Sequence, residues 1–241
     1  MDSKKDNLLG ILIEARIASR RKLAAAIMEG RVTVNGKVAN NLRSPVNQKD
    51  KITIDGQAVG LKPKQYVYIM LNKPDGVLST VRDERGRKTV SSFIPGKYRH
   101  LRLYPAGRLD MDTIGLLLLT NDGELTYRLT HPGFEHEKEY LALVKGTLRP
   151  EELKKLQKGV RLEDGMTAPA KVKEVKDSPP FNYSLTIHEG RKRQVRRMFE
   201  HLGYPVLALK RVRLGKLRLG DLKEGDVREL GGEELDLLKS N

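Results

Sequence analysis

The sequence contains no cysteine, and its longest apolar run is short. Without cysteine the chain can form neither a disulfide framework nor a thiolate zinc site, and catalysis by a cysteine nucleophile is excluded. The apolar run at residues 114–119 is far shorter than the roughly 20 residues that cross a bilayer. Residues 1–21 have no long apolar core and no small-residue cleavage site. We therefore expect a cytoplasmic protein without a membrane partner.

Motifs of nucleotide-driven enzymes are also missing. No glycine-rich segment ends in Gly-Lys-Ser or Gly-Lys-Thr, and no dinucleotide fingerprint follows an expected strand. The 241 residues, 38% of them hydrophobic, supply enough apolar material for one medium domain and one small domain.

Positive charge is abundant: 46 Lys and Arg against 31 Asp and Glu give a net charge of +15. The natural partner of such a surface is a polyphosphate, although lysine is also common for solubility alone. The distribution favours nucleic acid, because the cations gather in clusters that make local fields. These clusters lie at residues 20–22, 191–197 and 210–213.

The first sixty residues have the pattern of a compact module. Ser19 offers a side-chain oxygen to cap a helix, Gly30 ends that helix, and Asn35-Gly36 is typical of a tight hairpin turn. The expected elements are helices at 8–17 and 20–29 and strands at 32–34, 37–38 and 52–54.

A linker at residues 60–65 leads into a larger α+β domain. We expect the boundary between residues 62 and 63, which gives domains 1–62 and 63–241. The expected elements are strands at 66–71, 116–120, 139–145 and 183–187, helices at 124–129, 150–158 and 194–202, a helical or irregular segment near 89–96, and a C-terminal helix after residue 232.

The most singular stretch is GRLDMDTIGLLLLTNDGE at residues 107–124, where a polar loop precedes an apolar strand. Such a loop suits a catalytic site. Calcium binding is disfavoured, because the positions that need an oxygen ligand and a bidentate glutamate hold Ile114 and Asn121. Hydrolysis by Asp110 and Asp112 is disfavoured too, since an extended loop does not hold two neighbouring carboxylates at a defined separation. A structural ion pair between Arg108 and Asp110 stays open from the residues alone.

The whole block resembles the signature of the RsuA/RluB branch of pseudouridine synthases. NKPDGVLST at 72–80, HPGFEHEKEYLA at 131–142, the segment 188–215 and the closing GDVREL align with that branch in the same order. Residues 18–39 resemble the alpha-L RNA-binding motif. The resemblance implies a small helix-helix-hairpin RNA-binding module, followed by a larger catalytic domain with a mixed or antiparallel sheet. The run at 118–125 leans towards members that act on large-subunit ribosomal RNA.

The resemblance also implies the chemistry and the residues. One uridine of ribosomal RNA, free or in an assembling subunit, is isomerised without cofactor or metal. The sequence does not give the oligomeric state, and a monomer is the default expectation. Asp110 is the catalytic carboxylate, Tyr140 lies beside the uracil, and Arg196 holds Asp110 ionised. Whether Asp110 attacks the base, attacks the ribose or removes a ribose proton stays open.

Other interpretations of the same residues remain. Spacing alone favours a core tyrosine in a strand for Tyr140, and Arg196 is also typical of a phosphate contact. A non-catalytic ribosome-assembly factor would use the same basic clusters, and a carboxylate hydrolase needs a second acid that is not evident. The expected RNA contacts are Arg20, Arg21, Lys22, Arg31, Arg108, Arg191, Lys192, Arg193 and Arg197.

Overall fold

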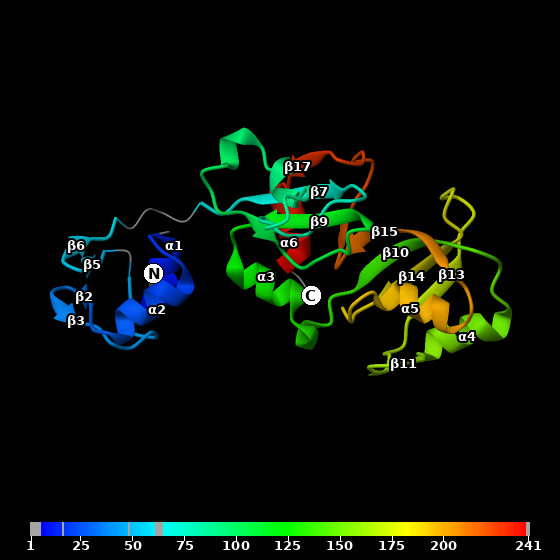
Figure 1. The fold of residues 1–241 in the computed structure, drawn as a ribbon, viewed down its shortest axis with the longest axis horizontal. Helices are drawn as coiled ribbons and strands as arrows, with labels where there is room; N and C mark the ends of the chain where they lie inside the picture. Colours follow the sequence, from blue (N-terminus) through cyan, green and yellow to red (C-terminus); the bar gives the residue numbers. More distant parts are fainter. Residues whose placement is uncertain (1–5, 16, 48, 61–64, 240–241) are drawn as a thin grey trace. The chain divides into compact units, whose positions relative to one another are not determined.

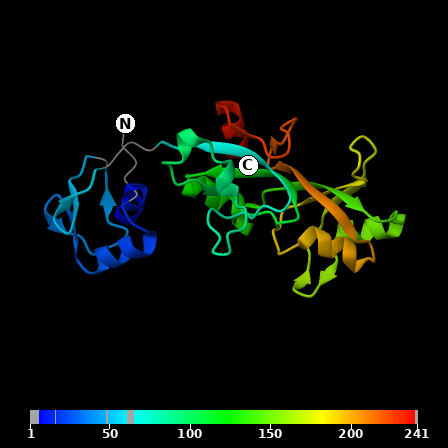
Figure 2. The same cartoon turned by 45° about the horizontal axis from the view of Figure 1, so that its top comes forward.

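The computed structural model describes residues 6–15, 17–47, 49–60 and 65–239. The chain divides into two compact units, Met1–Gln65 and Tyr66–Asn241 (Figures 1 and 2). The boundary predicted between residues 62 and 63 and most of the predicted linker lie outside the described residues. In the described part of the chain, no helix is both long and apolar enough to cross a membrane.

The first unit packs two helices on a small sheet. Its elements are β1 (Asp6–Asn7), α1 (Leu8–Glu14), α2 (Arg20–Met28), β2 (Val32–Val34), β3 (Lys37–Val38), β4 (Pro45–Val46), β5 (Ile52–Ile54) and β6 (Gln57–Ala58). The sheet order is β3-β2-β5-β6, and β1 pairs with β4. Asn35 has a φ of 51° and Gly36 one of 79°, which confirms the predicted turn.

The first helix ends earlier than the sequence predicted. It stops at Glu14 rather than Ile17, whose side chain is 50% exposed and so adds nothing to the core. The predicted cap of the second helix is confirmed, because the Lys22 backbone N–H donates to Ser19 Oγ. Leu8, Leu23 and Ile52, among others, fill an apolar core between helices and sheet.

The second unit is built on one large twisted sheet. Its strands are β7 (Tyr68–Lys73), β8 (Tyr104–Pro105), β9 (Ile114–Thr120), β10 (Lys138–Val144), β13 (Lys171–Glu174), β14 (Tyr183–Ile187), β15 (Val206–Leu214), β16 (Leu217–Arg218) and β17 (Val227–Glu229). The order is β13-β14-β10-β15-β9-β7-β17, with β8 beside β9 and β16 beside β15. Neighbours along this path are antiparallel except β15 and β9, which run parallel. The predicted mixed sheet is confirmed.

The helices of this unit cover both faces of the sheet. Their bounds are α3 (Gly123–Thr130), α4 (Pro150–Lys158), α5 (Gln194–His201), α6 (Gly232–Lys239), and the 3-10 turns η1 (Val90–Phe93), η2 (Gly96–Tyr98) and η3 (Pro132–Phe134). A two-stranded hairpin, β11 (Arg161–Leu162) and β12 (Gly165–Met166), stands apart from the sheet.

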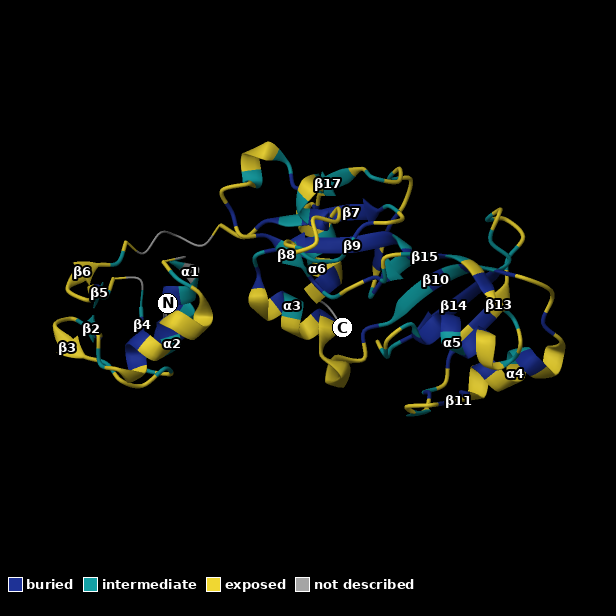
Figure 3. Ribbon diagram, viewed as in Figure 1, coloured by how far each residue is buried: buried dark blue, intermediate teal, exposed yellow. Residues whose placement is uncertain are grey.

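Successive side chains of β9 enter two different apolar clusters. Leu117 packs in the cluster that includes Leu156 of α4 and Phe199 of α5, whereas Leu118 packs in the cluster that includes Leu125 of α3. Because a strand alternates its side chains, both faces of β9 are buried, as Figure 3 shows for the central strands. The polar loop that precedes β9 is therefore attached to a rigid part of the core.

Candidate active site

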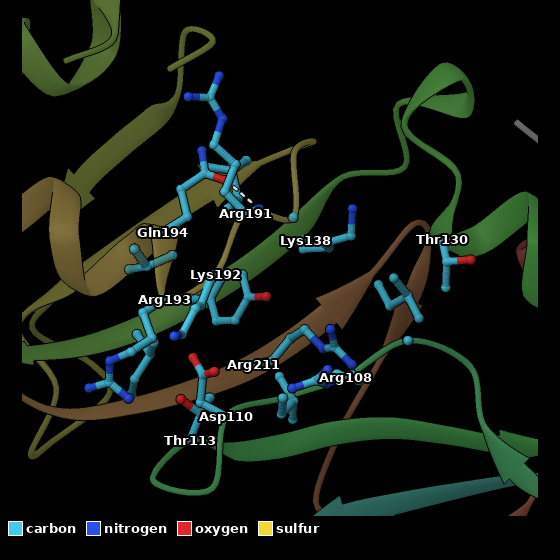
Figure 4. Close-up of a pocket in the computed structure, with 18 of the residues that line it drawn as sticks. Arg108, Asp110, Thr113, Thr130, Lys138, Arg191, Lys192, Arg193, Gln194 and Arg211 are labelled. Atoms are coloured by element: carbon cyan, nitrogen blue, oxygen red, sulfur yellow. Dashed lines mark hydrogen bonds between the residues drawn. The ribbon is translucent and has the colours of Figure 1, made fainter. Parts of the chain in front are cut away.

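A cavity of about 440 Å³ lies in the second unit (Figure 4). It is lined by the loop 106–113, by β10 and β15, and by residues 190–195 at the start of α5. Its volume lies in the range of roughly 300–1,000 Å³ that small-molecule sites occupy. The predicted residues that line it are Asp110, Tyr140, Arg108, Arg191, Lys192 and Arg193.

The loop that carries Asp110 is held by backbone contacts. Ser79 Oγ donates to the Leu109 carbonyl oxygen at 2.8 Å and accepts from the Leu109 N–H at 3.1 Å. The Thr113 N–H donates to the Asp110 carbonyl oxygen at 3.1 Å. Leu109 and Thr113 are buried, while the Asp110 side chain is partly exposed at the cavity. Within the described part of the chain, no hydrogen bond or ion pair engages the Asp110 carboxylate.

Lys73 fastens this loop to the end of β7. Its side chain is fully buried, and its Nζ donates to the carbonyl oxygens of Pro74 (2.9 Å), Val77 (2.8 Å) and Met111 (3.1 Å). Burial lowers the pKa of Lys73 to about 8. Sequence reasoning left this lysine outside the catalytic set, and the structure gives it a supporting position.

The sequence analysis predicted that Arg196 pairs with Asp110. In the structure, Arg196 pairs with the neighbouring Asp112 instead. Its Nη2 donates to the Asp112 carbonyl oxygen at 2.7 Å and lies 3.4 Å from the carboxylate, and its Nη1 donates to the Val206 carbonyl oxygen at 2.8 Å. Arg193 donates to both Asp112 carboxylate oxygens at 2.9 Å. The hydrogen bonds from Arg193 are the largest of the causes that lower the pKa of Asp112.

The ion pairs of Asp112 argue against a calcium site and against hydrolysis by two carboxylates in this loop. A carboxylate that two guanidinium groups occupy is not available as a calcium ligand or as a second catalytic acid. Among the described residues, no group of three or more His, Asp or Glu side chains is arranged to hold a metal ion.

Tyr140 and Arg211 are neighbours on two adjacent strands of the cavity wall. Tyr140 of β10 is opposite Arg211 of β15, and Arg211 is opposite Gly115 of β9. Gly115 has a φ of +108°, and a Cβ there would overlap the Arg211 backbone. Only glycine allows the two strands to approach so closely. Tyr140 is 9% exposed and lines the cavity.

Sequence reasoning missed Arg211 and Lys138 as cavity residues. Arg211 was read only as one of a basic cluster, and its place on an alternating strand was the available signal. Lys138, two residues before Tyr140, donates to the carbonyl oxygens of His136 at 3.0 Å and His188 at 2.9 Å. Burial lowers the pKa of Lys138 to about 8.

Two of the predicted RNA contacts, Arg197 and Arg191, make hydrogen bonds to the β11–β12 hairpin. Arg197 donates to both carboxylate oxygens of Asp164 at 2.9 Å and does not line the cavity. Arg191 donates to the carbonyl oxygens of Gly165 at 3.2 Å and Met166 at 2.6 Å. Arg108 is exposed at the cavity, and Lys192 lines it as well.

The basic residues of the first unit differ in how far they are neutralised. Arg20, Arg21 and Lys22 are exposed in the first turn of α2, where the helix dipole disfavours cations, so their placement suits an external anion. Arg31 is paired with Glu29 at 2.9 Å and with Asp55 at 2.8 Å.

Comparison with known proteins assigns both units. The RNA pseudouridylate synthase family model matches residues 67–201, and the S4 domain model matches residues 11–52, where the sequence predicted an RNA-binding module. The chain is 49% identical over 209 residues to ribosomal large subunit pseudouridine synthase B of Bacillus subtilis, which covers 86% of this chain and 84% of that protein. An uncharacterized RNA pseudouridine synthase of Aquifex aeolicus is 44% identical over 93% of this chain and 90% of its own length.

A solved structure agrees over nearly the whole length. A crystal structure of a pseudouridylate synthase matches with a TM-score of 0.69 and 33% identity, over 97% of this chain and 99% of that one. The predicted family, fold class and enzyme class are thereby confirmed. The chain belongs to the RNA pseudouridylate synthases, isomerases of uridine in RNA, and it carries an S4 domain before its synthase domain.

Proposed function

We propose that this protein isomerises one uridine of large-subunit ribosomal RNA to pseudouridine, that Asp110 is its catalytic carboxylate, and that no cofactor takes part. The observation that carries the proposal is the position of Asp110. It is an unpaired carboxylate on a braced loop at the wall of a cavity large enough for a nucleotide. The relative from Bacillus subtilis, named for the large ribosomal subunit, supports the choice of RNA.

The target base must leave its helix before Asp110 can reach it. A uridine that is flipped out loses its stacking on neighbouring bases. Contact with an aromatic side chain in the pocket offsets this loss, and Tyr140 supplies that side chain here. The apolar cavity residues Ile187, Val195 and Leu209 exclude water from the bound base.

The reaction needs no atom from outside the substrate. The bond between N1 and C1′ breaks, the uracil turns in the cavity, and a bond forms between C5 and C1′. C5 loses a proton and N1 gains one, so the product keeps the composition of the substrate. Asp110 acts in its ionised form, either as a nucleophile or as a base towards the ribose. Arg193 and Arg196 hold the loop through Asp112 and so keep Asp110 in place.

The two units divide the work of binding. Residues 1–62 form the RNA-binding module, with Arg20, Arg21 and Lys22 on phosphates, and residues 63–241 form the catalytic domain. Arg108 and Lys192 contact the backbone next to the flipped nucleotide. Arg31 contributes little net charge, because two carboxylates already neutralise it.

Chemical mapping of pseudouridine tests this function. Unmodified large-subunit and small-subunit ribosomal RNA are each incubated with the purified protein, treated with carbodiimide and read by primer extension. The proposal expects one new stop, in large-subunit RNA alone. A stop only in small-subunit RNA overturns the choice of RNA, and no stop in either, on free RNA or on assembling subunits, overturns the activity.

A further inference from the structure

Two buried polar side chains at the cavity lack a hydrogen-bond partner among the described residues. Arg211 is 3% exposed and its Nη2 has no acceptor, and Thr113 is 2% exposed and its Oγ1 has no partner. Both residues line the cavity that contains Asp110. Because buried polar groups in proteins are almost always paired, these two atoms point to groups that the substrate supplies.

The Arg211 guanidinium is fixed in direction by the strands around it. Its Nε donates to the Leu116 carbonyl oxygen of β9 at 2.8 Å, which leaves Nη2 as the unmatched donor. Its backbone is locked between Tyr140 on one side and Gly115 on the other. Arg211 and Asp110 both line the cavity (Figure 4). Arg211 is therefore a donor of fixed direction in the wall of the cavity that contains Asp110.

We propose that Arg211 and Thr113 bind the carbonyl edge of the flipped uracil and make the site selective for uracil over cytosine. This inference rests on the proposed function. A guanidinium only donates, and the uracil carbonyl oxygens only accept, so the two match. The Thr113 hydroxyl meets the adjacent edge of the ring, since it either accepts from N3–H or donates to a carbonyl. Cytosine places an amino donor where uracil has O4, which sets a donor against Arg211.

The symmetry of uracil gives this contact a use during the reaction. During the reaction the ring turns about the line through N3 and C6. This turn brings C5 to the position beside C1′ that N1 held before. O2 and O4 then exchange places. A fixed donor that binds a carbonyl oxygen before the turn meets a carbonyl oxygen after it, so Arg211 holds the base in both orientations. Preorganised donors of this kind need no movement at the moment of reaction.

A phosphate is a less suitable partner for Arg211. Arg211 is 3% exposed in a cavity wall that also contains the buried side chains of Leu209 and Leu214, whereas backbone phosphates carry their charge at the solvent side of a flipped nucleotide. Arg108, exposed at the same cavity, is the better phosphate contact. The experiment separates the two partners, because UMP and CMP share the phosphate and differ in the base.

The first test measures binding of UMP and of CMP to the full chain by NMR titration. Wild type is expected to bind UMP at least about tenfold more tightly than CMP, which corresponds to one discriminating contact. In Arg211→Lys and in Thr113→Val the ratio falls towards one. Lys210→Gln, one residue away and not lining the cavity, keeps the wild-type ratio.

Each other result overturns the inference. Equal or undetectable binding of both nucleotides by wild type removes the selectivity, and an unchanged ratio in both variants removes the two residues. Equal weakening of UMP and CMP in Arg211→Lys assigns Arg211 to the phosphate. Thr113→Val preserves side-chain shape, so it decides the matter if Arg211→Lys does not fold, which a thermal melt reveals.

A second test uses turnover on the unmodified ribosomal RNA. Arg211→Lys and Thr113→Val are expected to lower kcat at least about tenfold while the Kd for the RNA changes less than about twofold, because most of the RNA affinity comes from backbone contacts. If wild type converts no uridine, the proposed function fails. If wild type converts a uridine and both variants match its kcat, only this inference fails.

Discussion

The Arg193 guanidinium donates to both carboxylate oxygens of Asp112, whereas the carboxylate of Asp110, two residues earlier, has no hydrogen bond or ion pair among the described residues. The two carboxylates of one loop therefore have different tasks. Asp112 is part of the support, tied to α5 through Arg193 and Arg196. Asp110 is left to face the cavity. This division explains how a short polar loop is both rigid and reactive.

Replacing Gly115 by alanine is expected to separate β9 from β15. The new Cβ would overlap the Arg211 backbone, and the positive φ adds strain, so the free energy of unfolding falls by about 2–5 kcal/mol. Urea unfolding measures the change. Gly203→Ala is the matched control, since Gly203 has a φ of +87° with no atom near its Cβ position. Equal losses in the two variants would contradict the close approach of the strands.

Replacing Lys73 by methionine is expected to release the loop that bears Asp110. Three buried or partly buried carbonyl oxygens lose their donor, which lowers the free energy of unfolding by about 2 kcal/mol. Turnover falls as well, because Asp110 is no longer held at the cavity. Thermal unfolding and single-turnover rates measure both effects. Lys158→Met, at an exposed site on α4, should change neither.

The rate of isomerisation is expected to fall as the pH rises above about 8, since the pKa of Lys138 is lowered to about 8. A lowered pKa means that the lysine loses its proton, and with it one hydrogen-bond donor and its charge, at a lower pH than a free lysine. A positive charge is then lost from the wall of the cavity that receives the polyanionic substrate. A pH–rate profile tests this.

Arginine is the matched replacement at position 138, because a guanidinium stays charged throughout this range. In Lys138→Arg the decline above pH 8 is expected to disappear or to move to higher pH. An unchanged alkaline decline in this variant would assign it to another group, of which Lys73 is the first choice.

The cations at the start of α2 are expected to bind RNA phosphates. Changing Arg20, Arg21 and Lys22 together to glutamine should reduce the slope of log K against log salt by about 2 to 3, since each phosphate contact contributes roughly 0.7–0.9. Filter binding over a salt series measures the slope. Arg31→Gln is the control, because Glu29 and Asp55 already pair with Arg31. A larger effect of Arg31→Gln than of the triple variant would reverse this assignment.

The sequence predicted best the elements whose pattern has a single meaning. The helix at 150–158 and the strand at 183–187 coincide with α4 and β14, and the Asn35-Gly36 turn was placed correctly. The central strand β15 was missed, because Lys210, Arg211 and Arg213 look like a solvated basic cluster. In the sheet, Arg211 is buried by residues of neighbouring strands, so its burial depends on contacts that are distant in the sequence.

The sequence also predicted only a part of the candidate site. The position of the polar loop before an apolar strand predicted a site around Asp110, and that loop does line the cavity. The predicted partner of Arg196 was wrong. Arg196 donates hydrogen bonds to the backbone carbonyl oxygens of Asp112 and Val206, and because every residue has a carbonyl oxygen, the sequence does not reveal such a partner. Arg211 reaches the cavity only through strand register, which depends on Gly115.

The replacement of Asp110 by asparagine tests the proposed catalytic carboxylate most directly. Single-turnover conversion and RNA affinity are measured on the same unmodified ribosomal RNA for Asp110→Asn and for the matched variant Asp112→Asn. We expect Asp110→Asn to lose at least about a thousandfold in rate with its Kd for RNA within about twofold, and Asp112→Asn to keep measurable turnover. Turnover by Asp110→Asn at a rate near that of wild type would contradict the assignment and move the chemistry to another residue.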